Sequence, residues 1–186
     1  SNSMVKVMGC STVISSLIEP IHEIAIMKIL HHRYPEYAKY QMSCFSEEST
    51  AKSRRWCGLC SKCARIYIYL LAVGVSPEKV GFKEDMLTEK KKYLYALFGT
   101  SNKGAGVYDQ SGLGRDEQLL GFYLAYKRGA KGKLMDIFKR DYFFEAKKRE
   151  KELRQKFFGI HTTNSLSYDL KRRVLRIYQE ELKNLV

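Results

Sequence analysis

The sequence has 186 residues, and 45% of them are hydrophobic, which suits one packed domain or one domain with an extension. Its 33 Lys and Arg outnumber its 20 Asp and Glu, and the net charge of +13 favours anionic partners such as nucleic acid or nucleotides. No stretch approaches the roughly 18 consecutive apolar residues of a membrane helix, and the five cysteines are too unevenly spaced for a secreted disulfide scaffold. We therefore expect a cytoplasmic protein with no membrane partner.

Hydrophobic periodicity predicts a first helix over about residues 20–32, which ends shortly before Pro35. Residues 36–55 are polar and aperiodic, and this pattern indicates a loop that carries Cys44. An apolar run follows at residues 63–75. Its β-branched residues are compatible with a strand, but thirteen residues are long for a strand, so we predict a helix.

The second half of the chain reads as further helices. A third helix is predicted over residues 84–98, and a glycine-rich stretch follows at 101–114. The next helix is expected to open at residues 115–117 with acids in its first turn and to end at Gly129. A long charged helix from Lys133 to about Phe158 and a last helix near residues 167–185 complete the pattern.

Four cysteines form the sharpest motif of the sequence, with the spacing C-x12-C-x2-C-x2-C at Cys44, Cys57, Cys60 and Cys63. Two-residue gaps let neighbouring thiolates point at one ion, and Zn²⁺ prefers four such ligands in a tetrahedron. Because protein fills all four positions, the metal is expected to hold the fold and not to do chemistry. An iron–sulfur cluster uses the same ligands, and unmetallated thiols are a further alternative. Cys10 lies outside this motif, and we expect it to be a small buried hydrophobic residue.

Two smaller groups of residues carry candidate interactions. Lys62 and Arg65 lie beside the cysteines and would offset the negative charge of four thiolates, or else are solvated helix residues. Gly112, Gly114 and Arg115 could place backbone N–H groups and a guanidinium around a phosphate or carboxylate of a substrate. The alternative for the glycines is a surface loop without a ligand.

A basic segment is the strongest charge feature, because residues 127–156 contain twelve basic and five acidic residues. With Tyr142, Phe143 and Phe144 interleaved, this stretch could bind RNA or DNA by charge and stacking. The alternative is a solvated helix whose acids pair with its bases and whose aromatic rings point into the core.

These elements predict a mainly α fold of about six helices with a four-cysteine zinc knuckle. Any strands are expected to be short, at residues 4–8 or 12–18. We divide the chain into residues 1–82, a zinc-knuckle region with flanking helices, and residues 83–186, a helical region that contains the basic helix.

Four segments resemble a known family. Ser43-Cys44-Phe45 and Trp56-Cys57-Gly58-Leu59-Cys60-Ser61-Lys62-Cys63 resemble the zinc-cysteine signature of PP-loop ATP pyrophosphatases, both 7-cyano-7-deazaguanine synthases and the UDP-MurNAc-Ala-Glu epimerase-like branch. The stretch SLIEPIHEI at residues 16–24 looks like the SLxxPxxE segment of the epimerase-like branch, and GLGRDEQLL at 112–120 is similar to its glycine-plus-acid motif.

The resemblance implies a place in an enzyme that uses ATP and Mg²⁺ to adenylate a carboxylate and release pyrophosphate. The SGGxDS loop that binds ATP in this family does not occur in the sequence. We therefore expect a C-terminal fragment, inactive alone, with a structural and substrate-side role beside an N-terminal nucleotide-binding domain or subunit. The alternative is a zinc-containing module that binds RNA or DNA through the basic helix.

Overall fold

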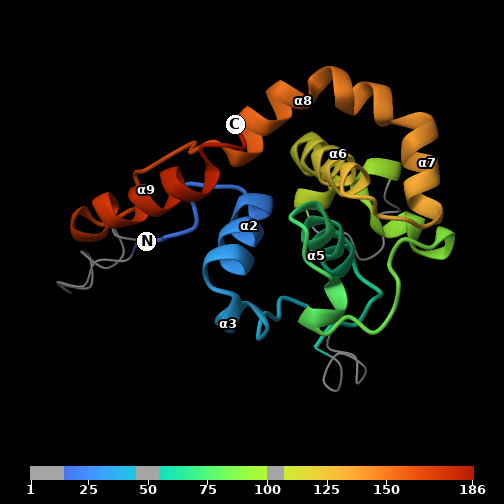
Figure 1. The fold of residues 1–186 in the computed structure, drawn as a ribbon, viewed down its shortest axis with the longest axis horizontal. Coiled ribbons are helices and arrows are strands. Elements are labelled where there is room, and N and C mark those ends of the chain that lie inside the picture. Colours follow the sequence, from blue (N-terminus) through green and yellow to red (C-terminus); the bar gives the residue numbers. More distant parts are fainter. Residues whose placement is uncertain (1–14, 45–54, 100–106) are drawn as a thin grey trace.

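The computed structural model describes residues 15–44, 55–99 and 107–186, and it is mainly helical (Figure 1). Within these ranges no residue lies in a strand, and no helix is long and apolar enough to cross a membrane. The strand expected at residues 4–8 and most of the one at 12–18 fall outside them. The elements are α2 (Glu23–Arg33), α3 (Pro35–Ala38), α5 (Ser61–Ala72), η1 (Pro77–Val80), η2 (Glu89–Leu94), η3 (Ala96–Phe98), η4 (Tyr108–Gln110), α6 (Gly112–Lys127), α7 (Lys133–Asp141), α8 (Phe143–Phe158) and α9 (Tyr168–Leu182).

The apolar run after the cysteines forms helix α5, which lies at the centre of the molecule against α6 (Figure 1). Ile66, Ile68 and Leu70 are fully buried there, and each such side chain contributes roughly 1.5–3 kcal/mol by leaving water. One hydrophobic cluster runs from Ile21 to Leu182, so the core crosses the boundary that we drew after residue 82. The cysteine knuckle therefore leads directly into the central core helix.

Helix α6 begins three residues earlier than expected, and α3 adds a short helix inside the predicted loop. Ser111 is the N-cap of α6, and its hydroxyl accepts a hydrogen bond from the backbone N–H of Gly114 at 3.0 Å. In α3, Pro35 occupies the first helical position, where proline loses no hydrogen bond. Local capping thus set both helix starts.

The α-helix predicted over residues 84–98 is wrong, because this segment forms the short 3-10 helices η2 and η3 with extended backbone at Tyr95 between them. Short i→i+3 backbone hydrogen bonds, such as that from the Tyr95 N–H to the Lys92 carbonyl at 3.1 Å, are supplemented by side chains. The Gln118 side chain accepts a hydrogen bond from the Leu97 N–H at 3.2 Å, and the Tyr95 hydroxyl donates to the Met86 carbonyl at 3.1 Å. The buried residues of the segment do not follow α-helical periodicity, since Leu94, Tyr95, Ala96 and Leu97 are consecutive.

The single helix predicted over residues 133–158 is two helices, α7 and α8, which meet at an angle at Tyr142 (Figure 1). Tyr142 leaves helical geometry at φ −124°, and its ring packs edge-on against Phe98 with centroids 5.5 Å apart. The bend lets Phe138 in α7 and Phe157 in α8 both enter the core, where each is fully buried. A straight helix could not bury both faces against a rounded core.

Candidate metal centre

The knuckle between Cys57 and Cys60 is held rigidly before α5. Gly58 adopts φ +68°, a left-handed conformation that glycine tolerates without strain. The carbonyl of Gly58 accepts a hydrogen bond from the Lys91 ammonium at 2.7 Å. Ahead of the knuckle, the buried indole of Trp56 donates to the Val80 carbonyl at 2.9 Å. The turn and its two anchors fix the positions of the cysteines that it carries.

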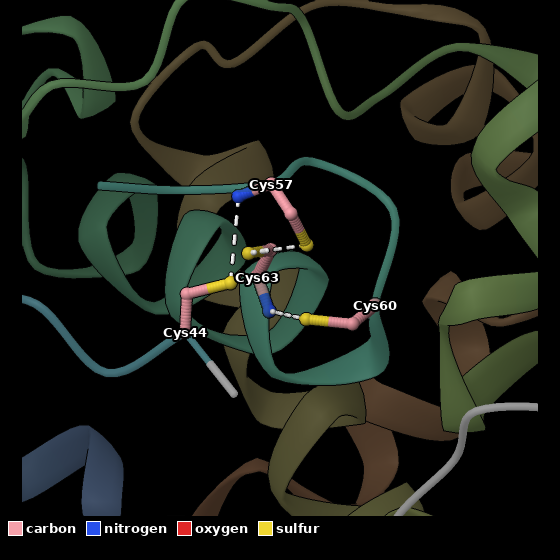
Figure 2. Close-up of side chains that lie close together, drawn as sticks. All are labelled: Cys44, Cys57, Cys60 and Cys63. Carbon is pink, nitrogen blue, oxygen red and sulfur yellow. Dashed lines mark hydrogen bonds between the residues drawn. The ribbon is translucent and has the colours of Figure 1, made fainter. Parts of the chain in front are cut away.

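Four sulfur atoms converge at this point (Figure 2), because the Sγ atoms of the four cysteines all lie within 4.8 Å of one another. The Sγ atoms of Cys57 and Cys63 are 3.7 Å apart, and both residues are buried. Four ligands of a tetrahedral zinc ion at about 2.3 Å would lie about 3.8 Å from one another. Separations of this size fit ligands around one ion and exclude a disulfide, whose sulfurs are about 2.05 Å apart.

Backbone N–H groups also point at the sulfurs. Cys60 is the N-cap of α5, and its Sγ accepts a hydrogen bond from the Cys63 N–H at 3.4 Å. The Cys44 Sγ accepts from the Cys57 N–H at 3.4 Å, and the Cys57 Sγ accepts from the Leu59 N–H at 3.3 Å. Such donors and the positive end of a helix dipole both stabilise thiolates. These hydrogen bonds therefore offset part of the cost of placing negative charge on sulfurs in this site.

The thiol pKa values diverge because the sulfurs share one small volume. Hydrogen bonding from Cys63 lowers the pKa of Cys60 to about 5, while burial raises the pKa of Cys57 to about 11. The hydrogen bond that it gives to Cys60 also raises the pKa of Cys63. A bound cation removes this competition, since it stabilises all four thiolates together.

The fold and these cysteines define a mainly helical domain with a four-cysteine cluster placed to hold a metal ion. A comparison of the chain with protein-family models, with curated proteins and with solved structures finds no match.

The structure places Lys62 and Arg65 in an ion-pair network. The Lys62 ammonium contacts the Glu23 carboxylate, and the Arg65 Nε lies 2.6 Å from the other oxygen of Glu23. The buried guanidinium of Arg65 also donates to Asp109 at 2.7 Å. Lys62 therefore links α5 to α2, and Arg65 links α5 both to α2 and to the segment before α6.

Gly112, Gly114 and Arg115 lie in the first turn of α6, and two of them have protein partners there. Arg115 forms a bidentate ion pair with Glu145, with both N···O distances at 2.9 Å. A Cβ on Gly114 would come within 2.2 Å of the Tyr108 carbonyl oxygen, so glycine here permits a close backbone approach. Around Gly112 a Cβ would meet nothing within 4 Å.

Sequence reasoning missed a buried carboxylate in α6. Glu117 has no exposed surface, and its Oε1 accepts a hydrogen bond from the Ile24 N–H at 2.9 Å. Its other oxygen accepts from the Tyr108 hydroxyl. Burial raises the pKa of Glu117 above its usual value. The available signal was helical register, because Glu117 precedes the buried Leu120 by three residues and therefore lies on the apolar face of α6.

Proposed function

We propose that Cys44, Cys57, Cys60 and Cys63 hold one structural Zn²⁺ ion, and that this ion stabilises the domain. The observation that carries the proposal is the convergence of four sulfurs within 4.8 Å at the start of the central helix. Four cysteine ligands leave no open coordination position for water or substrate. The ion therefore supplies folding free energy and no catalytic chemistry.

The ion ties the segment after α3 to the core. Lys39, Tyr40 and Met42 are exposed, whereas Cys44 is half-buried against the hydrophobic cluster. The Lys39 carbonyl accepts a hydrogen bond from Arg55 and Gln41 bonds to α2, whereas Cys44 is the residue of this segment that reaches the knuckle before α5. Loss of the ion should release residues 39–44 first and then weaken the knuckle before α5.

The test is elemental analysis of the purified chain, with thermal unfolding before and after chelation. We expect about one zinc per chain and a lower unfolding temperature after chelation. Cys44→Ser should lose most of the zinc, and the matched control Cys10→Ser should keep it. If elemental analysis finds iron and no zinc, the four cysteines hold an iron–sulfur cluster and the zinc proposal is wrong. A chain without metal, whose unfolding temperature does not change on chelation, would also refute the proposal.

We further propose that the domain belongs to a PP-loop ATPase-like, carboxylate-adenylating protein and forms its substrate-side wall. The support is the resemblance of residues 43–45 and 56–63 to the zinc-cysteine signature of that family. ATP and Mg²⁺ would bind to an N-terminal nucleotide-binding domain or subunit. We expect ATP–pyrophosphate exchange only when that partner is supplied, and exchange by this chain alone would contradict the proposed division of roles.

A further inference from the structure

Helix α8 presents one face to solvent that carries an aromatic ring and three lysines. Phe144, Lys147, Lys148 and Lys151 recur at i, i+3, i+4 and i+7, so they form a single stripe, here called the α8 stripe. All four side chains are exposed. The opposite face packs into the core through Ala146, Leu153, Phe157 and Phe158.

The lysines of the α8 stripe have no acidic partner among the residues that the structure describes, because the acids nearby are taken by other cations. Each acid of the last turn of α7 and of α8 pairs with an arginine at 2.6–2.9 Å. These pairs are Asp141 with Arg140, Glu145 with Arg115, Glu150 with Arg154, and Glu152 with Arg149. The stripe therefore keeps three uncompensated positive charges within about one helical turn, roughly 6 Å along the helix axis.

The three aromatic residues at this bend differ in how far they are buried. Phe143 is half-buried against the core, with its ring centroid 5.3 Å from that of Tyr126, and Tyr142 packs on Phe98. Phe144 touches the Phe143 ring edge-on, with centroids 5.9 Å apart, and leaves 79% of its own surface exposed at the start of the lysine row. Exposure of a phenyl ring to water is unfavourable, so binding of a partner that covers the ring is favoured.

We propose that the α8 stripe binds single-stranded nucleic acid, with the lysines on phosphates and Phe144 stacked on a base. Cations that follow a backbone beside an aromatic platform are the elements of single-strand binding. A membrane surface fits less well, because an interfacial helix inserts its apolar face, and the apolar face of α8 is buried in the core. The proposal does not depend on the metal centre.

The experiment is fluorescence anisotropy of labelled oligo(dT) and oligo(U) of about 16 nucleotides, the upper end of single-strand site sizes, titrated with the full chain. Affinity should fall steeply between about 50 and 200 mM salt. The Lys147→Gln/Lys148→Gln/Lys151→Gln variant should lower the slope of log K against log salt by about 2, since each phosphate contact contributes about 0.7. Surface changes of this kind leave folding intact, which circular dichroism verifies.

A second pair of variants tests stacking. Phe144→Leu keeps an apolar side chain without a stacking face and should weaken binding roughly 5-fold or more, whereas Phe144→Tyr should bind like the original chain. Tyr168→Leu is the matched control, because Tyr168 is 92% exposed but lies on α9. Equal losses for Phe144→Leu and Tyr168→Leu would overturn the stacking step.

The charge control removes the same number of positive charges elsewhere. Lys83, Lys90 and Lys183 are exposed and scattered, and their triple glutamine variant should keep most of the affinity. A loss equal to that of the α8 variant would mean that net charge alone attracts the oligonucleotide, which overturns the site. Tighter binding to phosphatidylserine vesicles than to either oligonucleotide would also overturn it, in favour of a membrane surface.

Discussion

Glu117 caps helix α2 from a position 93 residues away, and its removal should destabilise the whole domain. The first N–H groups of a helix need partners outside the helix, and His22, the N-cap of α2, offers no side-chain hydrogen bond. The Glu117 carboxylate accepts from Ile24 in that first turn, and Ile24 is fully buried. Water therefore cannot replace the carboxylate there.

The expected cost of Glu117→Ala follows from the groups that it leaves unpaired. The Ile24 N–H and the Tyr108 hydroxyl both lose their acceptor, and each unsatisfied buried group costs about 1–3 kcal/mol. Tyr108 is half-buried and recovers part of this from water. We expect a total loss of about 3 kcal/mol in the free energy of unfolding, which is roughly 6–12 °C in melting temperature for a chain of this size.

Urea unfolding at neutral pH measures the loss, with the midpoint lowered and the slope unchanged. Glu117→Gln should stay within about 1 kcal/mol of the original chain, because its amide can accept from Ile24 and donate to Tyr108. Glu89→Ala, at an exposed carboxylate, should change stability by less than about 0.5 kcal/mol. An alanine variant at position 117 as stable as Glu89→Ala would refute the capping role.

The pH dependence gives an independent check on the burial of Glu117. Since its pKa is raised in the folded state, its contribution to stability is full below the unfolded pKa of about 4.5 and is lost as pH rises through the folded value. The Gln variant cannot titrate at this position. It should therefore gain stability relative to the original chain as pH rises through that window, and a constant difference would contradict the raised pKa.

Three further changes probe the ion pairs and the core. Arg65→Gln should cost about 3–5 kcal/mol in chemical unfolding, since it leaves the buried Asp109 without its cation. Burial and the nearby charge of His161 lower the pKa of His22 to about 4. The free energy of unfolding should therefore fall by about 1–2 kcal/mol as pH drops from about 6.5 to 4, after allowance for the half-exposed ring. The His22→Gln variant should not show this loss of stability in acid. Leu153→Ala empties a fully buried position in α8 and should cost about 2–5 kcal/mol by the same unfolding assay.

Features with a short-range cause were predictable from the sequence. The apolar periodicity around residues 20–32 and 167–185 located α2 and α9 within a few residues. The cysteine spacing predicted a shared site because a two-residue gap constrains neighbouring thiols whatever the rest of the chain does. Cys44 was assigned to the same site only because it is a fourth cysteine near the other three. Its contact with Cys57 depends on how the chain folds between them, which local spacing does not predict.

Features with a long-range cause were not predictable in the same way. The segment at residues 84–98 has the composition of a helix, but it forms 3-10 structure in which the distant Gln118 side chain accepts the Leu97 N–H. At Tyr142 no glycine or proline marks the bend, which comes from packing on Phe98. In both places a residue distant in the sequence contacts the segment, by a hydrogen bond to Leu97 or by ring packing on Tyr142. These tertiary contacts outweigh the local helix propensity.

Asp116 and Glu117 show how far helical register decides the role of an acid. They are adjacent in the sequence, but neighbours on a helix point about 100° apart. Asp116 therefore lies near the surface and pairs with Arg149 at 2.8 Å, where its pKa is lowered, while Glu117 enters the core and has its pKa raised. Two adjacent acids in α6 thus have different roles: Asp116 forms an ion pair with α8, and Glu117 caps the distant helix α2. Of the two, only Glu117 links the N-terminal and C-terminal halves of the fold.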